Sequence, residues 1–528
     1  MKNNILFIST ILILTIINVI MMYIYGQYCT FSGDDAWFSL YQENESIFRC
    51  LNPNYGHGAG YIGVFLNKIF SFALPATIGI HPQDFMSLQH NIIKGIFTTI
   101  ILLSITQFLN FYVRNRNFSI LLFSFLIGYF FYFAMGTCVI EVNYSFYRYF
   151  FSLLFFSIFW YFIFKNIIKT KTETSRKKLI IASICGYIVG TSIEISFFAS
   201  AFLCCLLIGH NLITSKLFKS LKYNLDKNFY IPSVFLFLGI FLFTNSEGFK
   251  SVANDRGMNN IHIDIATLKE FWSTYYQIYF QEMYIYWITF FILLVTSLYF
   301  AIRKNELKNV IFPILLQFSI LTVIFSLILC GKNSTFTDGN LFFLQHCNII
   351  FLYKMLILYP AIIYASYILK NIQIQIDKIE KFLIPIFLII LISLCISKYS
   401  FFVKMYDEYI DRYLKIKQSA YICEKMLRFY AIQGKTAIVD KKMLEAYFIN
   451  WYFPNTQEIN YTDSPIINTY YPRIYRDETI KTTGFQIEEN AIETFKQNGG
   501  SISDKELKDL NFSHLYDEKF VLNKEEEG

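Results

Sequence analysis

Two adjacent aspartates, Asp34 and Asp35, follow the first long apolar stretch of the chain, within the sequence SGDDAWF at 32–38. A carboxylate can act as a general base, and a pair of carboxylates can also bind a divalent cation. Where an apolar helix leaves the bilayer, such a pair is typical of a membrane-embedded enzyme with its chemistry on the non-cytoplasmic side. The alternative is that both are solvated residues capping the turn at 32–33.

The composition predicts an all-α polytopic membrane protein. Of the 528 residues 55% are hydrophobic and only 16% are charged, and the mean hydropathy is +0.40. The net charge is +7, and the lysines and arginines lie mostly in short loops between apolar runs. This pattern is explained by membrane topology and does not indicate a nucleic-acid partner. The first apolar stretch, 5–25, follows Lys2 and has no small-residue cleavage site after it, which indicates a retained span.

Short basic loops fix the orientation of the spans. With a cytoplasmic N-terminus, the dense basic loop at 165–178 is cytoplasmic only if four crossings precede it. The apolar stretch at 61–80 would be a fifth crossing. We therefore predict that it forms an interfacial or re-entrant helix, interrupted by Lys68 and Pro75.

The apolar stretch at 179–213 is long for one crossing, and we expect two short ones, because the next basic loop, 216–227, must return to the cytoplasm. Glu194 then falls near their outer turn. The full prediction is about eleven transmembrane helices, at 5–25, 92–113, 118–138, 147–164, two within 179–213, and 229–244, 284–302, 310–330, 341–369 and 382–398.

An odd number of spans places the C-terminal region outside. We predict a transmembrane domain over 1–400, with a long first outer loop at 26–91, and a small extracytoplasmic α/β domain over 401–528. Helical patterning at 405–432 and a strand-like run at 436–440 favour the mixed fold. The predicted location is the cytoplasmic (inner) membrane, with multiple passes.

Further charged residues stand at predicted outer ends. Burying the charge of Glu194 in a short apolar hairpin is costly unless the side chain faces a polar cavity. The alternative is that the side chain extends to the outer membrane interface. Arg256 lies in a large outer loop, where its guanidinium could bind a phosphate with two hydrogen bonds or be an ordinary solvated arginine. Glu141 and Arg148 flank the outer start of the fourth span, where they could bind a ligand head group or simply form an ion pair.

Other candidates carry weaker signals. His57 stands among glycines that allow close approach to a ligand, although a flexible loop explains it as well. His346 lacks a second His or Cys at metal-ligand spacing and is interpreted as a packed interfacial residue. Cys29 and Cys50, both in the first outer loop, could form a disulfide in an oxidising compartment or remain free thiols.

The chain resembles the GT-C type polytopic glycosyltransferases, in particular the phage-type O-antigen glucosyltransferases and an allied, largely uncharacterised group of bacterial membrane proteins. Four features carry the resemblance: GDD at 33–35, GYIVGTSIE at 186–194, NDRG at 254–257, and a C-terminal outer domain. They span almost the whole chain. The chain departs from the pattern at 57–60, where it has HGAG and such relatives often have a Gly-Arg pair.

The resemblance implies transfer of a sugar from a polyprenyl-phosphate donor to a glycan or glycolipid acceptor at the cell surface. It makes Asp34 the catalytic base and Asp35 a residue that orients the acceptor or binds a divalent cation; no other cofactor or metal is expected. The expected substrate-binding residues are His57, Glu141, Arg148, Glu194, Asn254 and Arg256.

Two alternatives remain. A flippase or transporter for a lipid-linked saccharide should show paired inverted repeats with polar residues near mid-membrane in both halves, and the sequence shows neither. An O-antigen polymerase or ligase typically has arginines in a large late outer loop, whereas the loop at 331–340 is short and contains only Lys332.

Overall fold

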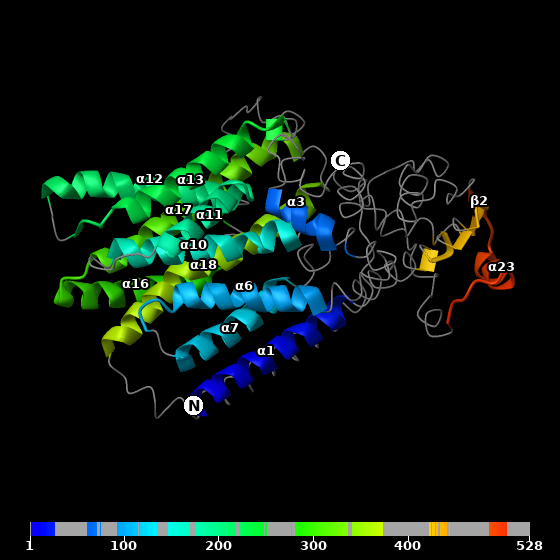
Figure 1. Cartoon of the computed structure of the whole chain (residues 1–528), viewed down its shortest axis with the longest axis horizontal. Helices are drawn as coiled ribbons and strands as arrows, with labels where there is room; N and C mark the ends of the chain where they lie inside the picture. The colour runs from blue at the N-terminus through cyan, green and yellow to red at the C-terminus, as the bar shows by residue number, and fades with distance from the viewer. Residues whose placement is uncertain are drawn as a thin grey trace.

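The computed structural model is a bundle of long helices that lie side by side (Figure 1). It describes residues 2–26, 61–70, 74, 92–113, 116–134, 146–168, 176–217, 221–247, 249–250, 276, 280–281, 283–335, 341–372, 485–503 and scattered positions between 422 and 443. The helices of the bundle are α1 (Lys2–Gly26), α3 (Tyr61–Lys68), α6 (Lys94–Leu109), α7 (Arg116–Ala134), the π-helix η4 (Phe146–Phe150), α10 (Ser152–Ile168), α11 (Arg176–Gly190), α12 (Glu194–Leu217), α13 (Lys227–Thr244), α16 (Tyr284–Lys304), α17 (Lys308–Thr335) and α18 (Leu341–Ile372).

Within the described ranges, helices occupy ten of the eleven predicted spans; the eleventh, 382–398, lies outside them. Five helical segments are long and apolar enough to cross a membrane, as expected for a membrane-embedded protein. They are Phe146–Ile168, Ile195–Thr214, Lys227–Thr244, Tyr284–Lys304 and Phe351–Ile372. Shorter apolar helices include Ile8–Met22, Lys94–Leu109, Phe118–Phe130 and Lys308–Ile324.

The structure bears on two local predictions. The stretch at 179–213 is divided, as predicted: α11 ends at Gly190, a turn follows, and α12 begins at Glu194. In the stretch at 61–80, α3 covers Tyr61–Lys68, residues 69–70 continue as π-helix, and Leu74 is helical. The other residues of that stretch lie outside the described ones, so its interpretation as an interfacial or re-entrant helix stays a prediction.

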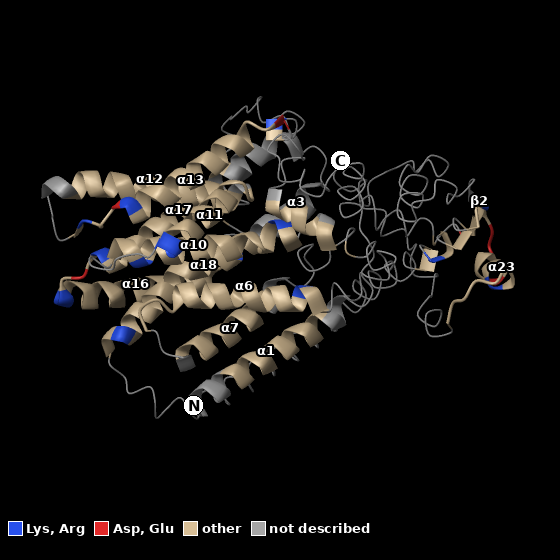
Figure 2. Ribbon diagram, viewed as in Figure 1, with Lys and Arg blue, Asp and Glu red and all other residues tan. Residues whose placement is uncertain are grey.

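We call the end of the bundle where α1 ends and α6 begins the outer end, after the predicted topology, and the opposite end the inner end. Lysines and arginines gather toward the inner end (Figure 2). They include Lys165 at the end of α10, Arg176 at the start of α11 and Arg303 at the end of α16. The predicted topology puts this end on the cytoplasmic side, where the positive-inside rule expects such residues.

The predicted topology can be tested by cysteine labelling. Single cysteines at Glu45 and Asn490, placed in a Cys-free background, should react with an impermeant maleimide in intact cells, since both sites are predicted to be outside. A cysteine at Lys304, exposed at the inner end, is the matched control and should react only after lysis. If Glu45 or Asn490 behaves like Lys304, the eleven-span topology is wrong.

Helices α11 and α13 pack closely together and meet through glycines. A Cβ at Gly186 would lie 2.6 Å from the carbonyl oxygen of Pro232, and one at Gly239 would lie 2.6 Å from that of Tyr187. At Gly190 a Cβ would collide with the backbone of α13 at Leu236. Small residues four apart allow this backbone-to-backbone approach between helices in a membrane. The glycines of the 186–194 motif therefore pack helices together.

Described residues of the C-terminal region include two strands and a helix. Strand β1 (Ala437–Val439) pairs in parallel with β2 (Phe485–Ile487), with Ala437 opposite Phe485. Helix α23 (Ala491–Gln497) follows, and its Phe495 ring lies 4.9 Å from that of Phe429. The predicted strand at 436–440 is confirmed in β1, while most of the predicted helix at 405–432 lies outside the described residues.

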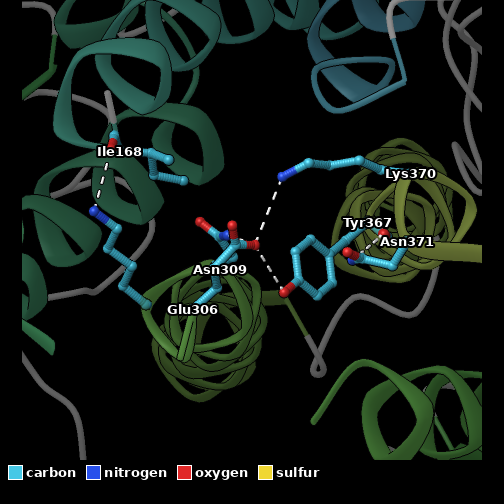
Figure 3. A network of polar contacts seen from close by, with 7 residues as sticks. Ile168, Glu306, Asn309, Tyr367, Lys370 and Asn371 are labelled. Atoms are coloured by element: carbon cyan, nitrogen blue, oxygen red, sulfur yellow. Dashed lines mark hydrogen bonds and ion pairs between the residues drawn. The ribbon is translucent and has the colours of Figure 1, made fainter. Parts of the chain in front are cut away.

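Hydrogen bonds fasten several helices together at the inner end (Figure 3). The Glu306 carboxylate, in the turn between α16 and α17, accepts from the Tyr367 hydroxyl and from Asn309 Nδ2, both at 3.0 Å, and lies 3.6 Å from Lys370 Nζ. Lys308 Nζ donates to the carbonyl oxygen of Ile168, the last residue of α10, at 3.2 Å. These bonds join α10, the α16–α17 turn and α18.

Glu306→Ala should lower the free energy of unfolding by about 1 kcal/mol, because the buried Tyr367 hydroxyl loses its carboxylate acceptor. Glu306→Gln keeps an acceptor oxygen and should lose less. The measurement is thermal unfolding of the detergent-solubilised protein. In a Tyr367→Phe background the effect of Glu306→Ala should shrink, and an undiminished effect would show that this hydrogen bond contributes nothing.

Candidate functional site at the outer end of the bundle

The structure places two of the predicted site residues at the outer end of the bundle. Arg148 belongs to η4, and Glu194 is the first residue of α12, where its backbone is described. Asp34, Asp35, His57, Glu141, Asn254 and Arg256 lie outside the described residues. Asp34 and Asp35 follow α1, which ends at this same end of the bundle (Figure 1).

Arg148 sits in a turn of π-helix. The backbone N–H of Phe151 donates to the carbonyl of Phe146, five residues earlier, at 3.1 Å. The Ser152 hydroxyl donates to the Tyr149 carbonyl at 2.6 Å, which satisfies a backbone group at the junction with α10. π-Helical turns of this kind are frequent at functional sites. In this turn the Arg148 side chain is half-buried, and its neighbours Tyr147 and Tyr149 are buried.

Helix α3 packs directly on this turn. A Cβ at Gly63 would lie 2.8 Å from the Arg148 Cα, so only glycine permits the observed contact. Two residues beyond α3, the Phe70 ring stacks on Tyr147 with centroids 5.6 Å apart. Helix α3 therefore supports the backbone that carries Arg148.

Two hydrogen bonds connect α10, which follows the Arg148 turn, to the start of α12. Ser152 Oγ lies 3.1 Å from Ser196 Oγ, and both side chains are buried. One turn further along α12, Ser200 Oγ accepts from Trp160 Nε1 at 3.0 Å. Because Ser196 is two residues after Glu194, these bonds hold the Glu194 backbone and the Arg148 turn on neighbouring helices at the same end.

Two lysines at this end were missed by sequence reasoning. Lys94, the first residue of α6, is fully buried, and its Nζ lies 5.4 Å from the centre of the Phe146 ring. Lys354 lies within α18, the most buried of the five long apolar segments. The signal was available, because both lysines stand inside predicted spans, at 92–113 and 341–369, where a charge points to function.

The chemistry offered by the described residues is therefore mainly cationic. Lys94 and Arg148 each lie close to an aromatic ring, Arg148 with its guanidinium carbon 5.1 Å from the centre of Tyr149. Among the described residues no three His, Cys, Asp or Glu gather as metal ligands, and Cys185, Cys204 and Cys205 are free thiols.

Comparison of the chain with protein-family models, with curated proteins and with solved structures finds no match in any of the three.

Proposed function

We propose that the protein is a membrane glycosyltransferase that moves a sugar from a polyprenyl-phosphate donor to a cell-surface polysaccharide, lipid or protein on the extracytoplasmic side. The observation that supports this most is the joining of the Arg148 turn to the start of α12 by Ser152 and Ser196. Two charged positions named from the sequence thus share the end of the bundle at which α1, the helix that precedes Asp34 and Asp35 in the sequence, ends.

In the proposed reaction, the Asp34 carboxylate takes the proton of an acceptor hydroxyl as its oxygen attacks the anomeric carbon of the sugar. The bond between that carbon and the phosphate oxygen breaks, and polyprenyl phosphate leaves with the electron pair. Arg148 and Arg256 stabilise the departing phosphate. Asp35 orients the acceptor or binds a divalent cation, and His57, Glu141, Glu194 and Asn254 complete the binding of donor and acceptor.

The proposal includes membership of the GT-C type, eleven spans in the cytoplasmic membrane and an extracytoplasmic domain at 401–528. The resemblance in motif order supports the first, and the basic residues of the inner end support the topology (Figure 2). The strand pair β1–β2 supports a mixed α/β fold for the C-terminal region.

The test is a transfer assay with the purified protein in liposomes. Polyprenyl-phosphate sugars labelled in the sugar are supplied one at a time, together with an envelope glycolipid extract from the same cells, and label in the acceptor is measured. We expect transfer from one donor. Movement of labelled lipid-linked saccharide across the bilayer without any transfer would favour the flippase, and lengthening of a lipid-linked glycan by whole repeats would favour the polymerase.

A further inference from the structure

The segment between α12 and α13 turns a tyrosine into the bundle at the inner end. Tyr223 is only 1% exposed, although it lies outside any helix or strand, and its neighbour Lys222 is exposed. Connecting segments normally run over the surface of a protein, because their backbone polar groups need partners. A buried tyrosine also needs a partner for its hydroxyl. The 221–226 segment must therefore be held in place by specific hydrogen bonds.

Helix α12 holds the backbone of Tyr223. Asn211 Nδ2 donates to the Tyr223 carbonyl oxygen, and the Tyr223 N–H donates to Asn211 Oδ1, both at 2.8 Å. This pair of bonds uses both the amide nitrogen and the amide oxygen of a buried side chain. One residue earlier in α12, His210 Nε2 lies 3.2 Å from the carbonyl oxygen of Leu221. The segment is thus fastened along the last turns of α12.

Helices α10 and α17 hold the segment as well. The Tyr223 hydroxyl donates to the carbonyl oxygen of Lys308, the first residue of α17, at 2.8 Å. The backbone N–H of Asn224 donates to the carbonyl oxygen of Ile167, near the end of α10, at 3.2 Å. Lys308 Nζ in turn donates to the next carbonyl of α10, that of Ile168. The 221–226 segment is therefore bonded to α10, α12 and α17.

A layer of aromatic rings lies across the bundle near this segment. The Phe164 ring of α10 is 4.2 Å from Phe312 of α17 and 4.7 Å from Phe111, which follows α6. The Tyr112 ring is 5.8 Å from Phe164 and 5.2 Å from Tyr367 of α18, all measured between ring centroids. We call these five rings the inner aromatic layer. Its edge-to-face and tilted contacts join the inner ends of α6, α10, α17 and α18.

Tyr223 meets the inner aromatic layer from the inner side. Lys308, which accepts its hydroxyl bond, is four residues before Phe312 on α17, so the two share a face and lie one helical turn apart. Opening the bundle at this end would have to separate the packed rings and break the bonds of the 221–226 segment together. A region held by many buried contacts opens far less often than one held by few.

We propose that Tyr223 is a plug that keeps the inner end of the bundle closed, so that ligands reach the interior from the outer end or from the surrounding lipid. Alternating access would require the inner end to open in each cycle. Such opening would pull α10, α12 and α17 away from the 221–226 segment that bonds to all three. The inference goes beyond the proposed function, because a plug restricts the route of access whatever chemistry the protein performs.

A native thiol, Cys204, can report whether the plug opens. It is fully buried and lies seven residues before Asn211 on α12, hence on the same face and about 10 Å deeper in the bundle. In a variant with Cys204 as its only cysteine, the rate of reaction with a charged methanethiosulfonate reagent is measured in membrane vesicles. The vesicles used are those in which Lys304→Cys, exposed at the inner end, is labelled. We expect Cys204 to react at least about 100-fold more slowly than Lys304→Cys.

Tyr223→Ala removes the plug and should raise the labelling rate of Cys204 at least about tenfold, because the ring and its bond to Lys308 are both lost. Tyr230→Ala is the matched control, since it deletes the same side chain from a half-exposed position in α13, and it should leave the rate unchanged. The melting temperatures of both variants are measured alongside. If Tyr223→Ala does not fold, Tyr223→Phe keeps the ring, removes the hydroxyl bond and must still label faster than the wild type.

The plug is overturned if Cys204 in the otherwise unchanged chain reacts as fast as Lys304→Cys, since the inner end then opens to water. It is also overturned if well-folded Tyr223 variants label no faster than Tyr230→Ala. Neither result depends on sugar transfer. Slow labelling that the Tyr223 variants accelerate, in a protein that transfers no sugar, supports the plug and removes the transferase. Fast labelling of Cys204 in an active transferase does the reverse.

Discussion

Asp34→Asn is expected to lower the rate of sugar transfer by about 10²-fold or more, with unchanged expression. Asparagine keeps the size and hydrogen-bonding capacity of aspartate but cannot accept the acceptor's proton, and general-base catalysis typically contributes about 10² to 10⁴ in rate. The measurement is the initial rate of label transfer at saturating donor. Wild-type turnover in Asp34→Asn would remove this residue as the base.

Asp35→Asn is the matched control, since it changes the neighbouring carboxylate in the same way. If Asp35 only orients the acceptor, Asp35→Asn should lower the rate of transfer less than Asp34→Asn does, and it should raise the KM for the acceptor. If Asp35 instead binds a divalent cation, transfer should depend on added Mg²⁺ or Mn²⁺, and the variant should need a higher concentration of the metal.

Gly190→Leu should severely destabilise the bundle, and Gly190→Ala should cost about 1–3 kcal/mol. At this position any Cβ meets the backbone of α13 at Leu236, with Gly239 and Ile240 also in contact, and a helix backbone cannot move aside as a flexible side chain can. The measurement is thermal unfolding of the detergent-solubilised protein, with the fraction of protein that remains monodisperse as the readout.

Gly209→Ala provides the control for that experiment. A Cβ at Gly209, in α12, meets nothing within 4 Å, so alanine adds helix propensity without a clash. Its melting temperature should equal or exceed that of the wild type. An unchanged melting temperature in Gly190→Ala would show that α11 and α13 can separate at little cost, contrary to the observed packing.

The positions of the helices were predictable because hydropathy and loop charge report directly on burial in lipid. The division of 179–213 followed from the positive loops alone, and the structure has its turn between Gly190 and Glu194. The same argument predicts that the stretch at 61–80, which contains α3, does not cross the membrane, since a further span would reverse the orientation of the basic loop that follows.

What the sequence could not show is which residues meet across helices. Hydropathy treats Lys94 as a small interruption of a span, whereas the structure buries it against Phe146. The π-turn at Arg148 and the contact between Ser152 and Ser196 depend on tertiary packing. The glycines at 186 and 190 were noted as part of a motif, but only the fold assigns them to close packing.

Helix α11 has a consequence for the surrounding lipid. It has only 15 residues, and the first three, Arg176 to Lys178, are basic, so its apolar length is about 18 Å. Ile180, Ile181 and Ile184 on this helix are more than half exposed and face outward from the bundle. In the proposed eleven-span topology α11 crosses the bilayer, and its hydrophobic mismatch with a core of about 30 Å would be relieved by local thinning of the bilayer. The head groups of lipids beside α11 would then lie nearer the middle of the bilayer than elsewhere in the membrane. A head group would therefore have a shorter distance to move along the membrane normal to reach the protein interior.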